Sequence, residues 1–354
     1  MTPLARLIAE RIGAHGPMRL DEYMQTCLLH PEHGYYTTRE PFGQKGDFIT
    51  APEISQMFGE VLGAALAQAW VDQGRPNGAV LAEIGPGRGT LMADVLRVLS
   101  RLPGWDAQVV LVEASPRLRA IQTARLGAVR HVDSVADLPQ APLFLLANEF
   151  FDALPIRQFR RAPAGWAELM VAAGPEGGLA FALGAPAPLP WPGPPGTVRE
   201  ICEPALPHAA AVATRIARHG GAAIFLDYGG WHGQGDTLQA LQGGHPADPL
   251  AAPGLADLTA HVDFAPLAQA ARQAGAQVSM LAEQGDVLAR LGIGQRAAAL
   301  AQARPDQAQA IAAALHRLTD KAEMGQLFKA LAIWPAQAPP VAGFAPAPPH
   351  GGQR

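Results

Sequence analysis

Cysteine is scarce in this chain of 354 residues, which contains only two, Cys27 and Cys202. They lie far apart and in unrelated sequence contexts, so neither a disulfide framework nor a thiolate metal site can be argued from them. This composition favours a reducing compartment. We expect the protein to be cytoplasmic.

Long hydrophobic runs and an excess of positive charge are also missing. Hydrophobic residues make up 49% of the chain, but no stretch reaches the roughly 20 apolar residues that span a bilayer, so no membrane insertion is expected. The N-terminal segment includes Glu10 and lacks the apolar core of a secretory signal, which predicts a first helix instead. With 27 basic against 31 acidic residues the net charge is −4, which gives no electrostatic reason to expect nucleic-acid binding.

The N-terminal part of the chain predicts helices joined by an irregular loop. Apolar residues recur at helical spacing over residues 4–12 and again over residues 54–70. Between them, residues 41–53 are too rich in glycine and proline for a regular element. We therefore expect residues 1–78 to form a helical N-terminal cap with a lid.

From about residue 79 the pattern favours an α/β fold. Short apolar strands alternate with amphipathic helices, as in a parallel sheet covered on both faces. The predicted strands are residues 80–84, 108–113, 129–132, 143–147 and 222–227. The last two are too far apart for one crossover helix, and alternation with period two between them predicts an antiparallel insertion at about 155–215. This domain should end near residue 336, before a disordered tail rich in proline and glycine at 337–354.

The strongest local signal is a strand that runs into three glycines, Gly85, Gly87 and Gly89. Glycine lets the backbone approach a ligand closely and adopt conformations that a Cβ forbids. A dinucleotide-binding loop prefers its third glycine one position later, where this chain has Thr90. That shift, together with Glu83 on the strand, favours S-adenosylmethionine over a nicotinamide. The alternative is a turn that needs glycines for its geometry alone.

Acidic residues follow the next two strands. Glu113 ends the second strand, where a carboxylate can accept hydrogen bonds from both hydroxyls of a ribose. Asp133 follows the third strand and is the natural neighbour of an adenine edge, although an aspartate there serves equally well as a helix cap.

The segment NEFFDALP, residues 148–155, follows the fourth strand. In open α/β sheets ligands bind at the carboxyl ends of the strands, so Asn148, Glu149 and Asp152 should lie near the reacting groups. Paired carboxylates beside two aromatic rings suit a cationic, planar methyl acceptor. The alternative is that Asp152 caps a helix and both phenylalanines belong to the core.

Four segments carry a resemblance to a known family: GDFITAPEISQ (46–56), EIGPGRGT (83–90), NEFFDALP (148–155) and DLTAHVDF (257–264). They are similar to the MidA family of methyltransferases, which includes the mitochondrial complex I assembly methyltransferase. The resemblance covers roughly residues 1–335 and implies a Rossmann-like seven-stranded methyltransferase sheet with a helical N-terminal cap. It also implies S-adenosylmethionine as donor and, for the mitochondrial members, dimethylation of an arginine on a complex I subunit. Residues 243–249 depart from the pattern, because relatives should carry an aromatic residue after His245.

An arginine acceptor would define the catalytic residues. Its guanidinium has a pKa above about 12, so carboxylates must hold it by bidentate hydrogen bonds and bias electron density toward the reacting nitrogen. Glu149 and Asp152 are the catalytic candidates, with Asp227 behind them. His261 is a further candidate, as a polar member of the acceptor site or as a structural residue. No metal is expected, because methyl transfer from a sulfonium needs none.

The lid would close over the cofactor, with Phe48 packing against it. The predicted cofactor-binding residues are Phe48, Thr50, Glu83, Gly85, Gly87, Gly89, Glu113, Asp133 and Asn148. We expect a protein substrate, such as a complex I subunit, and leave a homodimer open. Three other functions stay open: a nicotinamide oxidoreductase, a small-molecule methyltransferase, and a non-catalytic assembly factor that retains the fold.

Overall fold

The computed structural model describes residues 1–38, 50–174, 177–233 and 235–348. The chain forms two compact units, each built from three segments. Unit 1 combines Met1–Phe48, Phe151–Ala205 and His232–Asp263, and unit 2 combines Ile49–Phe150, Leu206–Trp231 and Phe264–Arg354. This division differs from the expected one at residue 78, because residues 49–78 group with the unit that holds the parallel sheet.

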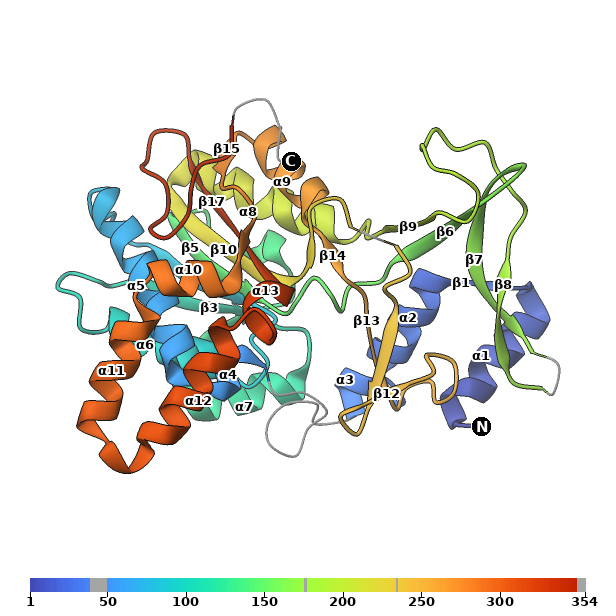
Figure 1. Cartoon of the computed structure of the whole chain (residues 1–354), viewed down its shortest axis with the longest axis horizontal. Helices are drawn as coiled ribbons and strands as arrows, with labels where there is room; N and C mark the ends of the chain where they lie inside the picture. The colour runs from blue at the N-terminus through green and yellow to red at the C-terminus, as the bar shows by residue number, and fades with distance from the viewer. Residues whose placement is uncertain (39–49, 175–176, 234, 349–354) are drawn as a thin grey trace. The chain divides into compact units, whose positions relative to one another are not determined.

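Unit 2 is built around a mixed sheet (Figure 1). Over the described residues, seven strands lie on one hydrogen-bonded path in the order β15, β17, β10, β5, β2, β3 and β4. The strands from β10 to β4 run parallel, and β17 runs antiparallel between β10 and β15. Their bounds are β2 Val80–Ile84, β3 Gln108–Val112, β4 Arg130–Val132, β5 Leu143–Asn148, β10 Gly221–Gly230, β15 Ala276–Val278 and β17 Phe328–Pro335, with β16 (Ala282–Glu283) also paired to β17. All five predicted strands are present, with ends displaced by at most three residues.

Helices precede and connect these strands, and the last four follow one another between β16 and β17. They are α4 Ala51–Ile54, α5 Gln56–Asp72, α6 Thr90–Leu99, α7 Pro116–Leu126, α8 Ala205–His219, α9 Phe264–Gln273, α10 Gln284–Arg290, α11 Ile293–Ala303, α12 Ala308–Thr319 and α13 Met324–Leu327, with 3-10 turns η1 Val135–Asp137 and η2 Pro305–Gln307. The single helix expected at 54–70 is divided at Ser55, whose side chain accepts a hydrogen bond from Met57 N and so caps α5. No helix of the described residues is long and apolar enough to cross a bilayer.

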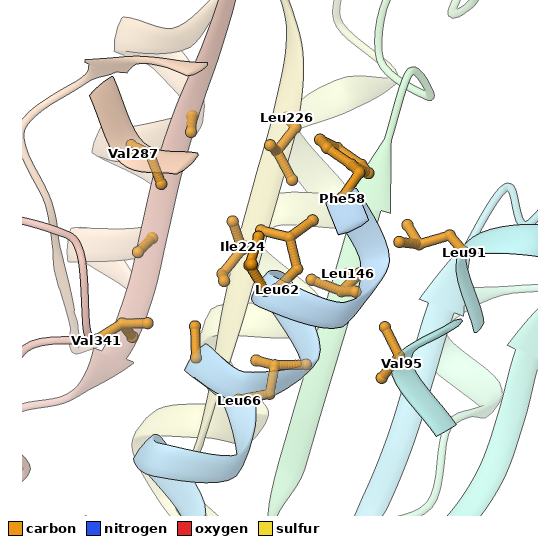
Figure 2. Close-up of a cluster of buried hydrophobic side chains, with 14 of the residues drawn as sticks. Phe58, Leu62, Leu66, Leu91, Val95, Leu146, Ile224, Leu226, Val287 and Val341 are labelled. Atoms are coloured by element: carbon orange, nitrogen blue, oxygen red, sulfur yellow. The ribbon is translucent and has the colours of Figure 1, made fainter. Parts of the chain in front are cut away.

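The core of unit 2 lies between α5 and the sheet. Figure 2 shows Phe58, Leu62 and Leu66 of α5 beside Ile224 and Leu226 of β10, and all five side chains are fully buried. Burial of side chains of this size stabilises a fold by roughly 1.5–3 kcal/mol each. This packing holds in place the strands whose carboxyl ends carry the predicted site residues.

Unit 1 joins the N-terminal helices to antiparallel strands. Its larger sheet has the order β1, β7, β6 and β9, with β8 also paired to β7, and its smaller sheet has the order β12, β11 and β13. The elements are α1 Pro3–His15, α2 Leu20–Leu29, α3 Tyr35–Thr38, β1 Met18–Arg19, β6 Arg157–Ala162, β7 Gly165–Ala173, β8 Leu179–Leu183, β9 Val198–Ile201, β11 Gln239–Gln242, β12 His245–Ala247, β13 Asp257–Thr259 and β14 Val262–Asp263. Antiparallel strands therefore occupy the inserted segment, and α8 begins before the expected end at residue 215.

Residues 243–249 begin as a tight hairpin. Gly243 and Gly244 connect β11 to β12 and have φ values of 61° and 76°. Positive φ at both turn positions is typical of the type I′ hairpin, which strongly favours glycine. His245, the first residue of β12, is exposed.

The tail is packed in its described part. Val341 and Phe344 are 1% and 7% exposed and belong to the core of unit 2. Ala347 N donates to Val278 O at 3.0 Å, and Met280 N donates to Ala345 O at 2.8 Å. The prediction of disorder was wrong for residues 337–348, because two buried apolar side chains and strand-like hydrogen bonds anchor a segment whose average composition is that of a linker.

Candidate functional site

The glycine loop between β2 and α6 has a backbone that requires glycine. Gly85, Gly87 and Gly89 have φ values of 63°, 50° and 75°, in the left-handed region that side chains disfavour. Gly89 directly precedes α6, so the loop presents the N-terminus of a helix. A Cβ on Gly85 would lie 2.9 Å from Cδ2 of Phe150. The loop is thus a tight turn with its bare backbone close to the end of β5.

Glu83, on β2, supports the start of α6. Its side chain is 3% exposed and accepts a hydrogen bond from the backbone N–H of Met92, while Oε2 has no hydrogen-bond partner. Burial raises the pKa of Glu83 to about 8, with the nearby charge of Glu113 adding to the effect. The predicted cofactor residue therefore also ties the strand to the helix that follows the loop.

Glu113 directly follows β3 and is held at both carboxylate oxygens. Oε1 accepts from Ser115 N at 2.8 Å, and Oε2 accepts from Nε2 of Gln122 at 3.1 Å. Burial raises the pKa of Glu113, and these donors oppose that shift. The same Nε2 of Gln122 donates to Gly87 O at 2.8 Å. One buried amide therefore connects the glycine loop to the predicted ribose ligand.

Asp133 lies just past β4 with a side chain that is 81% exposed. Its Oδ1 accepts from Nη2 of Arg119, while Nε of Arg119 donates to Glu113 O at 2.7 Å. The helix-cap alternative belongs to Ser134, whose hydroxyl accepts from Ala136 N at the start of η1. Asp133 is therefore not a cap, and its contact with an adenine stays a prediction.

The lid prediction falls largely outside the described residues, and Phe48 is among those not described. Thr50 is described and immediately precedes α4. From α4, Oε1 of Glu53 accepts from Thr90 Oγ1 at 2.5 Å, and Oε2 lies 3.9 Å from Arg88 Nη1. Thr90 in turn accepts from Arg125. Thr90, which stands where a dinucleotide-binding loop would have its third glycine, thus connects the glycine loop to α4 and α7.

The end of β5 brings Asn148 and Glu149 next to the glycine loop, because Ala147 pairs with Ile84 in the parallel register. Asn148 is 7% exposed, and its Oδ1 has no hydrogen-bond partner. The Nδ2 of Asn148 donates to Glu149 Oε1 at 3.0 Å. The same Oε1 also accepts from Ala51 N at 3.2 Å.

Glu149 has a strained backbone. Its φ is 51°, a conformation that costs a non-glycine residue about 1–3 kcal/mol and occurs often at functional sites. The next residue, Phe150, donates its N–H to Oδ2 of the fully buried Asp227 at 3.2 Å. Asp227 also accepts from Tyr228 N at 3.0 Å. Asp227 therefore fixes the backbone that follows Glu149.

Asp152 and His261 belong to unit 1, whereas Glu149 belongs to unit 2. Asp152 lies in a turn and starts no helix, so the cap alternative does not hold. Its carbonyl accepts from Ala260 N at 3.0 Å. His261 N donates to Thr237 Oγ1 at 2.9 Å, and burial lowers the pKa of the His261 ring. The pairing of Asp152 with Glu149 stays a prediction.

A tyrosine that the sequence did not single out lies in the same unit. The Tyr36 hydroxyl is 3.0 Å from both carboxylate oxygens of Asp257. Burial, with the nearby charges of Asp257 and Asp152, raises the pKa of Tyr36 well above its usual value. Unit 1 therefore holds a buried acid–phenol cluster.

Within the described ranges, no three His, Cys, Asp or Glu residues gather as a metal site.

The features of unit 2 fit S-adenosylmethionine. The left-handed glycines leave backbone where side chains would otherwise fill the space, and Glu113 offers a carboxylate oriented by two donors. Asn148 adds a buried oxygen able to accept a hydrogen bond. A model of a family of S-adenosyl-L-methionine-dependent methyltransferases matches residues 61–282. The chain belongs to this MidA-like methyltransferase family. S-adenosylmethionine is its cofactor.

Known relatives span nearly the whole of this MidA-like methyltransferase. The protein arginine methyltransferase NDUFAF7 of mouse mitochondria is 35% identical over 95% of this chain and 85% of its own length. The human protein of the same name is 35% identical over 95% and 84%. The crystal structure of a candidate methyl transferase from Burkholderia thailandensis, bound to S-adenosyl-homocysteine, superposes with a TM-score of 0.84 at 29% identity, covering 96% of this chain and 93% of that one.

Sequence reasoning missed Gln122 and Arg119, both on α7, the helix after the Glu113 strand. The buried residues of α7 are Leu118 and Gln122, one helical turn apart. A glutamine on the apolar stripe of a helix next to a predicted ligand strand is a detectable signal, because buried polar groups need partners. Tyr36 had no comparable signal, since its partner Asp257 is far away in the sequence.

Proposed function

We propose that this methyltransferase transfers a methyl group from S-adenosylmethionine to an arginine of a protein, such as a subunit of respiratory complex I. The observation that carries the proposal is Glu149, a carboxylate in a strained backbone at the carboxyl end of β5, beside the glycine loop. The arginine methyltransferase names of the mouse and human relatives support the same acceptor. We also propose that the sheet of unit 2 is the seven-stranded methyltransferase sheet, with the N-terminal helices as its cap.

The chain's own residues have three tasks in this proposal. Gly85, Gly87 and Gly89 admit the cofactor against bare backbone, and Glu113 accepts hydrogen bonds from its ribose hydroxyls. The cofactor supplies a methyl group already activated on a positively charged sulfur. Glu149 holds the guanidinium of the acceptor by charge-assisted hydrogen bonds, so that one nitrogen is aligned with the methyl group.

Asp152 and His261 are proposed to assist on the acceptor side. Asp152 would supply the second carboxylate for a guanidinium that keeps its charge at any working pH. The ring of His261, whose pKa burial lowers, would be a polar contact for the acceptor. Thr50, Glu83, Asp133 and Asn148 stay proposed cofactor contacts.

Mass spectrometry of arginine methylation tests this function. Cells that lack the gene would be complemented with the wild-type chain or with Gly87→Val, and peptides of complex I subunits would be compared. We expect a methylated arginine with the wild-type chain and none with the variant. Methyl transfer to a metabolite, with unchanged protein arginines, would support a small-molecule methyltransferase. If the wild-type chain and Gly87→Val complement the cells equally and neither leads to a methylated arginine, the result would support a non-catalytic assembly factor.

We propose the cellular setting from the scarcity of cysteine for the location and from the names of the relatives for the protein partner. A cytoplasmic location and a protein partner remain predictions, and a homodimer stays an open alternative. Subcellular fractionation with an antibody to the native chain, and light scattering of the purified protein, would test the location and the oligomeric state separately.

A further inference from the structure

Gln122 makes three side-chain hydrogen bonds from a fully buried position on α7. Its Nε2 donates to Gly87 O at 2.8 Å and to Glu113 Oε2 at 3.1 Å. Its Oε1 is 2.9 Å from Nε2 of His131, on β4. The amide thus reaches the glycine loop, the residue after β3, and β4 at once.

These partners fix the orientation of the amide. A glutamine side chain has two N–H donors on one end and an acceptor oxygen on the other. Gly87 O and Glu113 Oε2 are both acceptors, so the NH₂ group must face them, and a flipped amide would place oxygen against oxygen. Oε1 then faces His131, which must carry its proton on Nε2 to donate. His131 therefore locks the amide in the one productive orientation.

The locked amide completes the support of Glu113. Ser115 N holds Oε1 and Gln122 holds Oε2, so the plane of the carboxylate is set from both sides. A carboxylate has about four acceptor sites in total, so the bonds from Ser115 and Gln122, with a further one from the Ala114 backbone, do not exhaust its capacity to accept from a ligand. A pair of oxygens in a fixed plane matches two adjacent hydroxyls of a ribose.

We propose that Gln122 is a positioning residue for cofactor binding, which holds Glu113 in register with Gly87 so that loop and carboxylate meet the nucleoside together, with His131 locking its amide. The proposal rests on the proposed role of Glu113 as the ribose ligand. It assigns Gln122 no contact with the cofactor itself.

Calorimetric titration with S-adenosylhomocysteine tests the proposal. Gln122→Glu keeps the shape and the acceptor for His131 but removes both donors and places a second carboxylate against Glu113. We expect its affinity to fall by at least about tenfold, as for the loss of a hydrogen bond to a charged group. Gln122→Met, which removes all three bonds, should fall by a similar factor. Gln68→Met is the matched control, because Gln68 donates to the carboxylate of Asp72 at 2.7 Å on an exposed face of α5.

Two further titrations separate positioning from general stability. For an analogue that lacks both ribose hydroxyls, Gln122→Glu should lower the affinity by less than about threefold, since Glu113 then has no hydroxyl to bind. When Glu113 is already replaced by Ala, adding Gln122→Met should lower the affinity for S-adenosylhomocysteine by less than about a further threefold. Circular dichroism melting checks that every variant is folded. If Gln122→Met fails to fold, the isosteric Gln122→Glu carries the test.

The outcomes distinguish this proposal from the role of Glu113. If Glu113→Ala binds as the wild type does, Glu113 is not the ribose ligand, and the positioning role falls with it. If Glu113→Ala binds weakly but folded Gln122→Glu binds like the Gln68→Met control, the positioning role alone is wrong. Equal losses with and without the ribose hydroxyls would also overturn it, because they indicate a purely structural glutamine.

Discussion

Gly85 and Phe150 lie in contact, so close that a Cβ on Gly85 would be 2.9 Å from Cδ2 of the phenylalanine ring. The ring also packs edge-on against His208, with centroids 5.3 Å apart. Gly85 opens the glycine loop and Phe150 follows Glu149, so this contact joins the cofactor loop to the proposed acceptor residue. Disturbing either side should therefore affect both binding and transfer.

Gly87→Val should abolish binding of S-adenosylhomocysteine while the protein stays folded. A β-branched side chain at a φ of 50° is strained, and it would occupy the space where the backbone meets the ligand. Calorimetric titration measures the affinity, and circular dichroism verifies the fold. Unchanged affinity would mean that the loop is only a structural turn. Gly13→Val, within α1 of unit 1 with nothing near its Cβ position, is the control.

Glu113→Gln should weaken cofactor binding by about 1–3 kcal/mol, the range for losing charge-assisted hydrogen bonds to buried hydroxyls. The amide keeps the shape of the side chain, but one of its ends can no longer accept. Titrations should compare S-adenosylmethionine with an analogue lacking the ribose hydroxyls. The role of Glu113 is excluded if the mutation costs as much with that analogue as with the full cofactor.

Glu149→Gln and Asp152→Asn should each keep cofactor affinity but lower methyl transfer by at least about tenfold, or roughly 1.4 kcal/mol of transition-state stabilisation. Each change preserves shape and removes the charge that pairs with a guanidinium. Single-turnover transfer at saturating cofactor, with complex I subunit peptides bearing arginine or lysine, provides the measurement. Wild-type rates in both variants on a confirmed substrate would move the search to His261 and Asp227.

The buried carboxyl of Glu83 should make stability depend on pH. Its pKa in the folded protein is about 8, above the ordinary 4.5, because burial disfavours the charged form. Its neutral form therefore stabilises the fold fully below about pH 4.5, and this contribution is lost as pH rises through about 8. In Glu83→Gln the side chain cannot ionise, so its Tm relative to the wild type should rise between pH 5 and 8.5, corresponding to a few kcal/mol.

Thermal melts across that pH range check the effect, with Glu10→Gln on the exposed face of α1 as control. The informative quantity is how the difference in Tm between Glu83→Gln and the wild type changes with pH. The amide of the variant places an N–H donor near the position of Oε2, and any cost of that donor is the same at every pH. Parallel Tm curves for Glu83→Gln and the wild type would show that Glu83 is charged in the folded state.

Phe344→Ala should destabilise unit 2 by about 3 kcal/mol, as expected for truncating a buried aromatic side chain. The side chain belongs to the main core although it lies in a segment rich in proline and glycine. Urea denaturation followed by tryptophan fluorescence gives the change, with Leu327→Ala, 49% exposed, as the comparison. An unchanged midpoint would restore the view of the tail as a linker.

Local patterns in the sequence were enough to predict the strands and the glycine loop. The strands at residues 80–84 and 143–147 are short runs that are apolar except for Glu83, a pattern typical of buried parallel strands, and the structure places them within one residue of their expected ends. The glycine loop was predictable from its three glycines at alternate positions, since left-handed backbone positions select glycine directly.

The tertiary structure alone decided the contacts between residues that are far apart in the chain. The grouping of residues 1–48 with 151–205 and 232–263 depends on which apolar faces pack together, and no local pattern records that choice. Tyr36 meets Asp257, and Thr90 meets Glu53, through packing alone. The sequence therefore determined the strands and the glycine loop, because local residue preferences select them. Only the folded chain could determine the positions of Gln122 and Phe344, because burial depends on what lies opposite.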